Sequence, residues 1–68
     1  MELTIEVVRE MDGRWLAQVV ELPGVMTYGK TRPKAVLSAK ALTLHVIADR
    51  MENGEIPVEL VSLSFQAA

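Results

Sequence analysis

The stretch that decides the fold is residues 21–31, which read Glu-Leu-Pro-Gly-Val-Met-Thr-Tyr-Gly-Lys-Thr. Pro23 fixes a backbone φ near −65°, and Gly24 follows at the position where a type II turn needs a positive φ. Residues 22–25 are therefore expected to form a tight reversal between two strands. Gly29 offers a second conformationally permissive position before the stretch ends.

The end of the same stretch predicts the start of a helix. The Thr31 hydroxyl is suited to accept from the free amides of a first helical turn, and Pro33 fits where a missing N–H has no consequence. Arg32 precedes a proline, which disfavours helical angles, so either Thr31 or Arg32 is the expected cap. The apolar spacing then predicts one helix over Pro33–Glu52 that stops at Asn53-Gly54.

Two alternating segments before this stretch predict a β-hairpin. Residues 3–10 form the first expected strand, and residues 14–21 form the second. Asp12-Gly13 between them is a strong signal for the turn of a hairpin. The positions expected to face the core are Leu3, Ile5, Val7, Trp15, Ala17 and Val19.

The remaining segments complete a small sheet. Residues 25–28 are expected to pair antiparallel with the second strand, and residues 58–65 are predicted as a last strand with a frayed tail over 66–68. The helix before this last strand is long enough to return it parallel to the first strand. The predicted fold is α+β, with the order β-β-β-α-β and one long helix on one face of a four-stranded mixed sheet ordered 3-2-1-4.

Length and composition limit the classes of function. A chain of 68 residues forms a single domain, residues 1–68, and buries only about 60% of the surface that it exposes when unfolded. Half of the residues are hydrophobic, and the net charge is −2. Without a basic face, direct nucleic-acid binding by this chain alone is not expected. No apolar run approaches the roughly 20 residues that span a bilayer, and Glu2 follows Met1, so a cytoplasmic protein without membrane contact is expected.

The predicted helix carries two apolar stripes. The first, which is expected to pack on the sheet, consists of Ala35, Val36, Ala39, Leu42, Thr43, Val46 and Ile47. The second, called the outer stripe below, consists of Leu37, Ala41, Leu44, Ala48 and Met51. Because an ordinary surface helix needs only one, the outer stripe indicates a partner or homo-oligomer interface. The alternative is that the tail folds over it, and dimer and tetramer both remain open.

The sheet face opposite the helix is a second candidate surface. Leu16 and Val20, with Val8 as a further member, are expected to lie on it. Either this face or the outer stripe could receive another protein.

No constellation of residues in the sequence predicts catalysis, a cofactor or a metal site. Glu6, Asp49 and Glu59 are the acidic residues that a two-metal nuclease site would need, but their predicted positions do not converge. His45 is expected on the polar side of the helix, and one imidazole without cysteine does not build a typical zinc site. Trp15 is expected in the core rather than stacked on a base. The protein is therefore not expected to be an enzyme.

The run from Asp12 to Ala39 resembles the HicB family of bacterial antitoxins. The shared pattern is filled here by Asp12, Gly13, Trp15, Ala17, Val19, Leu22, Pro23, Gly24, Thr27, Gly29, Thr31, Ala35 and Ala39. The resemblance implies a partial ribonuclease H-like fold. It also implies a binding module that covers a small HicA-type toxin, which cleaves messenger RNA. Acidic residues such as Glu6, Glu10 and Glu21 would then steer the encounter with a cationic toxin.

Two departures from the family pattern bear on this expectation. The first helical turn carries Pro33 and Lys34 where the family often has acidic residues. Many members also continue into a DNA-binding domain that these 68 residues do not include, so the chain is not expected to repress its own promoter unaided. The alternative function is a self-associating structural or regulatory protein whose partner is not a toxin.

Overall fold

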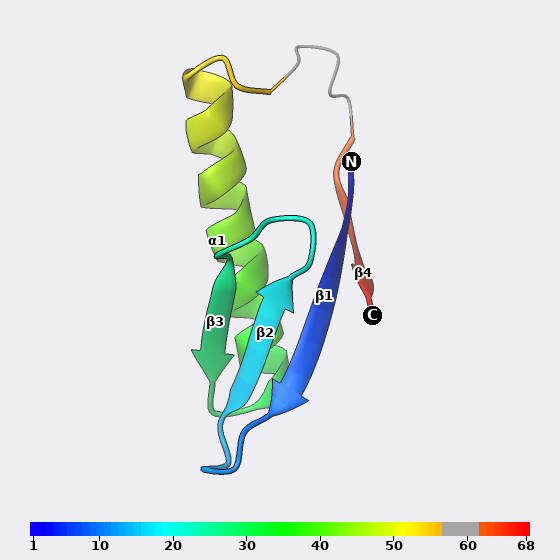
Figure 1. Ribbon diagram of the computed structural model, residues 1–68, viewed down its shortest axis with the longest axis vertical. Helices are drawn as coiled ribbons and strands as arrows, with labels where there is room; N and C mark the ends of the chain where they lie inside the picture. The colour runs from blue at the N-terminus through cyan, green and yellow to red at the C-terminus, as the bar shows by residue number, and fades with distance from the viewer. Residues whose placement is uncertain (57–61) are drawn as a thin grey trace.

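The computed structural model describes residues 1–56 and 62–68, which contain four strands and one helix (Figure 1). The elements are β1 (Glu2–Arg9), β2 (Trp15–Val19), β3 (Met26–Gly29), α1 (Arg32–Glu52) and β4 (Ser64–Ala67). This order confirms the predicted succession of a three-stranded meander, one helix and a last strand.

The four strands form one mixed sheet in the order β3-β2-β1-β4. β2 pairs antiparallel with both β1 and β3, whereas β4 pairs parallel with β1. The connection through α1 is thus the crossover that a parallel neighbour requires. The predicted α+β class and the strand order are both confirmed.

The helix packs on one face of the sheet, mainly over β3 and β2 (Figure 1). Ala17, Ala35 and Ala39 have no exposed surface, and their small side chains let the helix backbone approach the strands closely. The other buried residues are Leu3, Ile5, Val19, Leu22, Val25, Thr43 and Ile47. All the predicted core-facing strand positions lie on this face, with Val7 and Trp15 half-buried.

The predicted reversal at residues 22–25 is confirmed. Gly24 has a φ of 90°, and the Val25 amide donates to the Leu22 carbonyl at 3.0 Å. The hairpin between β1 and β2 also has its expected geometry, because Gly13 has a φ of 91°. Glycine is favoured at both positions because L side chains rarely adopt such angles.

Gly29 has a different role from the one expected. It does not adopt a positive φ, so conformational freedom is not what the position requires. A Cβ atom at Gly29 would instead lie 2.8 Å from the Ala35 Cα atom in the first turns of α1. Gly29 is needed because β3 and the helix backbone are in direct contact there.

Both ends of the helix have specific caps. Thr31 is the N-cap, and its hydroxyl accepts from the Lys34 amide at 3.2 Å, which decides between the two caps expected from sequence. At the other end, Gly54 has a φ of 70° and its amide donates to the Met51 carbonyl. The predicted stop at Asn53-Gly54 is confirmed, and the helix starts one residue earlier than predicted.

The last strand differs from the prediction. Residues 62 and 63 are not in a strand, β4 covers Ser64–Ala67, and the predicted start of the strand at 58–61 lies outside the described residues. The prediction of a frayed tail is wrong, because the Ala68 amide donates to the Ile5 carbonyl at 3.0 Å. β2 also ends early, at Val19, because the chain already turns at residues 20 and 21.

Candidate interaction surfaces

The face of the sheet that α1 does not cover, called the open face below, carries a row of apolar side chains. Leu16 of β2 lies opposite Val8 of β1 on one side and Tyr28 of β3 on the other. Val8 is 52% exposed and Tyr28 is 47% exposed, while Leu16 between them is half-buried. These three residues form an apolar row across three strands, in side-chain contact range for neighbouring strands.

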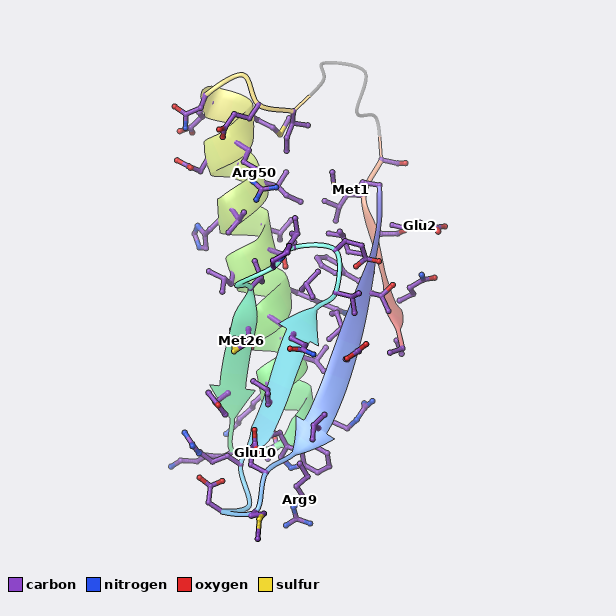
Figure 2. All side chains as sticks on the ribbon, viewed as in Figure 1. Met1, Glu2, Arg9, Glu10, Met26 and Arg50 are labelled. Carbon is purple, nitrogen blue, oxygen red and sulfur yellow. The ribbon has the colours of Figure 1, made fainter. Side chains whose placement is uncertain are left out.

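A second row beside the first is mixed in character. Met26, Gln18 and Glu6 are paired across the same three strands. The Gln18 side-chain amide donates to the Glu6 carboxylate at 3.1 Å, so this acidic group is held on the sheet surface. Met26 is 48% exposed and extends the apolar surface along β3 (Figure 2). Sequence reasoning missed Met26 and Tyr28, although the two-residue period of β3 relative to Leu16 could have indicated them.

The open face continues toward the turn after β2. Val20 is half-exposed there, as expected for a surface residue of this face. The adjacent Glu21 carboxylate accepts from the Thr4 amide at 2.7 Å and from the Thr4 hydroxyl at 2.8 Å. These two donors lower the pKa of Glu21 below its ordinary value. Glu21 therefore ties this turn to β1, a role that the sequence interpretation missed.

The hairpin tip forms the far end of the open face, where Glu10 also lies (Figure 2). The Arg14 amide and guanidinium both donate to the Asp12 carboxylate, at 3.0 and 2.7 Å. The two hydrogen bonds lower the pKa of Asp12, and Arg14 lies 4.3 Å from the centre of the Tyr28 ring. Asp12 thus orients a cation over an aromatic residue of the apolar row. Met11 at the tip is fully exposed.

The outer stripe lies on the exposed side of α1. Leu37 is 68% exposed, Leu44 54% and Met51 53%, and Ala41 and Ala48 between them are also exposed. Residues 62–68 do not cover this stripe, because they lie along β1. The alternative that the tail folds over the stripe therefore does not hold for these residues. The C-terminal half of α1 also extends past the ends of β2 and β3 (Figure 1).

A shallow groove between α1, β1 and β4 is a feature that the sequence did not indicate. Its volume is about 130 Å³, and its lining includes Ile5, Val7, Val36, Phe65, Arg32 and Lys40. The Lys40 ammonium lies 5.7 Å from the centre of the Phe65 ring. The groove exists because α1 lies over β2 and β3, which leaves the helix side of β4 without a covering helix.

The residues considered for chemistry are not brought together. Glu6 is on the open face and Asp49 is on the helix, so the sheet separates them, and Glu59 lies outside the described residues. Across residues 1–56 and 62–68, no three His, Asp or Glu side chains form a cluster that could hold a metal ion. His45 is exposed as expected, and Trp15 packs against the core with the Arg9 guanidinium 5.7 Å from its ring centre. The helix in the described part of the chain lacks the apolar length to cross a membrane.

Comparison with known proteins identifies a relative of this chain. No family model matches the chain, and no solved structure matches it. The UPF0150 protein Ta0767 of Thermoplasma acidophilum is 31% identical over 58 residues, which cover 84% of each chain. With that identity over most of both sequences, the chain belongs to the UPF0150 family.

Proposed function

We propose that the protein is an antitoxin-like binding module that sequesters a small HicA-type, messenger-RNA-cleaving toxin through its open face. Membership of UPF0150, a family grouped with the HicB-like antitoxins, supports this role. So does the HicB-like pattern between Asp12 and Ala39. The observation that carries the choice of surface is the exposed apolar row of Val8, Leu16 and Tyr28.

The apolar row has the character of the centre of a protein–protein interface. Burying a valine- or leucine-sized side chain contributes about 1.5–3 kcal/mol before the entropy of association is subtracted. Tyr28 adds a rigid ring, and Arg14 is already oriented over it by Asp12. Aromatic and arginine side chains dominate the binding energy of many interfaces, so this corner is the expected centre of contact.

The charge of the surroundings suits a cationic partner. Glu6 and Glu10 lie on or at the end of the open face, and the whole chain carries a net charge of −2. Opposite charge accelerates the encounter of two proteins, and the acidic charge of this chain disfavours RNA as its own partner. A module of this kind would act by covering the RNA-binding surface of the toxin in the cytoplasm.

The test is suppression of RNA cleavage by a purified HicA-type toxin encoded beside this chain. The wild-type chain should suppress cleavage, and Leu16→Asp should not, because it places a charge in the middle of the apolar row. Leu44→Asp, which introduces the same charge on the exposed side of α1, is the matched control and should still suppress cleavage. Circular dichroism of each variant checks that the fold is intact.

Two results would contradict the proposal. If the wild-type chain neither binds the toxin nor suppresses cleavage, the function is wrong. If Leu16→Asp suppresses cleavage as well as the wild type, the toxin does not use the open face.

A second candidate function is that of a self-associating structural or regulatory protein with a partner that is not a toxin. The exposed outer stripe of α1 favours it, because a toxin on the open face would leave that stripe uncovered. Gene context discriminates between the two: a short, basic neighbouring reading frame that halts growth when expressed alone favours the antitoxin.

A further inference from the structure

The outer stripe has the spacing of a coiled-coil seam. Its members follow one another at steps of four, three, four and three residues, which is the heptad alternation that keeps a stripe on one side of two paired helices. One set of seam positions holds the alanines, Ala41 and Ala48, and the other holds the large side chains. Alanine at every seventh position lets two helix backbones approach closely, and the large residues then fill the space beside it.

Charged residues at both ends of α1 interact unfavourably with the helix dipole. The first turn contains Lys34 and no acidic residue, whereas Asp49 and Glu52 lie in the last turn. A helix dipole favours acidic groups at the start and basic groups at the end, so these three charges weaken an isolated helix. Arg50 near the C-terminal end is placed favourably (Figure 2).

We propose that α1 pairs with α1 of a second copy of this chain in antiparallel orientation. In this register Leu37 packs against Ala48 of the second copy, and Ala41 packs against its Leu44. Lys34 then lies level with Met51 of the second copy and next to the adjacent Glu52, and the reverse pair forms at the other end. Two of the three misplaced charges, Lys34 and Glu52, gain an opposite partner, and the two helix dipoles oppose each other favourably.

Parallel pairing has the opposite electrostatic consequence. It would place Lys34 at the same end of the pair as Lys34 of the second copy and Glu52 at the same end as its Glu52, and it would align the two dipoles. The charge pattern therefore selects the antiparallel arrangement of two copies. The proposed dimer does not rest on the proposed function, because the stripe faces away from the sheet and pairing of the helices leaves both open faces free.

The first test measures the mass of the chain in solution. Static light scattering over a range of concentrations should show twice the 7.5 kDa of one chain. Leu44→Asp should reduce this to the mass of one chain. Met26 lies on the open face and is exposed to a similar extent as Leu44, so Met26→Asp is the control and should leave the dimer intact. A monomeric wild type, or a Leu44→Asp chain that remains dimeric, would overturn the proposal.

The second test determines orientation by disulfide formation, for which the absence of natural cysteine is convenient. Leu37→Cys combined with Ala48→Cys should form covalent dimers on oxidation, because the two positions face each other across the pair. Within one helix these positions are about 16 Å apart at 1.5 Å per residue, too far for an internal disulfide. Leu37→Cys alone should not link, and efficient linking by that single variant would show a parallel pair.

The third test exchanges the end charges. Lys34→Glu and Glu52→Lys should each weaken dimerisation, and the double variant should restore it, because the pair across the interface is re-formed with reversed signs. Each single change also improves the charge distribution of the helix itself, so a weaker dimer would not arise from a less stable helix. Failure of the double variant to recover would overturn the antiparallel register.

Discussion

The Glu21 carboxylate accepts two hydrogen bonds from Thr4, one from the backbone amide at 2.7 Å and one from the hydroxyl at 2.8 Å. Beside them, the Val20 amide donates to the Thr4 carbonyl at 3.0 Å. Together these bonds attach the turn after β2 to β1. A carboxylate therefore helps to hold the edge of the open face near Val20, in addition to the buried Leu22 and Val25 of the same turn.

This contact predicts an acid-sensitive contribution to stability. Because Thr4 lowers the pKa of Glu21 in the folded chain, the contribution is fully present above the unfolded carboxyl pKa of about 4.3 and is lost as the pH falls through the lower folded value. Glu21→Gln should lower the melting temperature near neutral pH and reduce its fall on acidification. Part of the fall should remain, since Asp12 also has a lowered pKa.

Thermal melts across this pH range, followed by circular dichroism, check the prediction. Glu2→Gln is the control, because Glu2 carries an exposed carboxyl at the start of β1, the strand that contains Thr4. An identical acid profile for Glu21→Gln and the wild type would mean that the Thr4 contact does not persist in solution.

Gly29→Ala should destabilise the chain through a steric clash with the helix. The added Cβ would meet the Ala35 backbone, and crowding of a packed interior typically costs about 1–3 kcal/mol of unfolding free energy. Gly24→Asn is the comparison, because it tests backbone conformation without a clash: Gly24 has a φ of 90° and open space around it, and asparagine tolerates such angles. Chemical denaturation should therefore give Gly24→Asn a clearly higher free energy of unfolding than Gly29→Ala. The reverse order would contradict the close approach of β3 and α1.

Thr31→Ala should lower the free energy of unfolding by about 1 kcal/mol, because it removes the hydroxyl that accepts from the Lys34 amide. Thr31→Ser retains an acceptor and should recover most of the loss. Arg32→Ala should have little effect, since Arg32 is already the first residue of the helix. Urea denaturation of the three variants measures this, and a larger loss for Arg32→Ala would place the cap one residue later.

The parts of the fold that were predictable from sequence are those fixed by local chemistry. The Pro23-Gly24 reversal, the Asp12-Gly13 hairpin and the Thr31 cap each depend on residues within four positions of one another. With these boundaries in place, the crossover rule for a helix between parallel strands was enough to predict the strand order.

The parts that were missed depend on contacts between distant residues. The Glu21–Thr4 contact joins residues 17 positions apart, and the end of β4 is set by its register on β1 rather than by any pattern in Gln-Ala-Ala. Tyr28 was missed as a surface residue because its position on the open face follows from pairing with Leu16. The outer stripe was correctly recognised as a second apolar stripe, and its use as an interface remains a prediction.

Among the residues that the structure describes, Thr43 is the one polar residue in the buried core, and its replacement by valine should be nearly neutral. Its hydroxyl donates to the Ala39 carbonyl at 2.8 Å, within its own helix. That carbonyl also receives the regular helical amide bond, so Thr43→Val leaves no acceptor without a partner and preserves the shape of the side chain. We expect a change of less than about 1 kcal/mol for Thr43→Val, against a loss of about 1–2 kcal/mol for Thr43→Ala, which leaves a small cavity. Equal losses in denaturant melts of the two variants would mean that the hydroxyl, rather than the filled volume, stabilises the contact of α1 with the sheet.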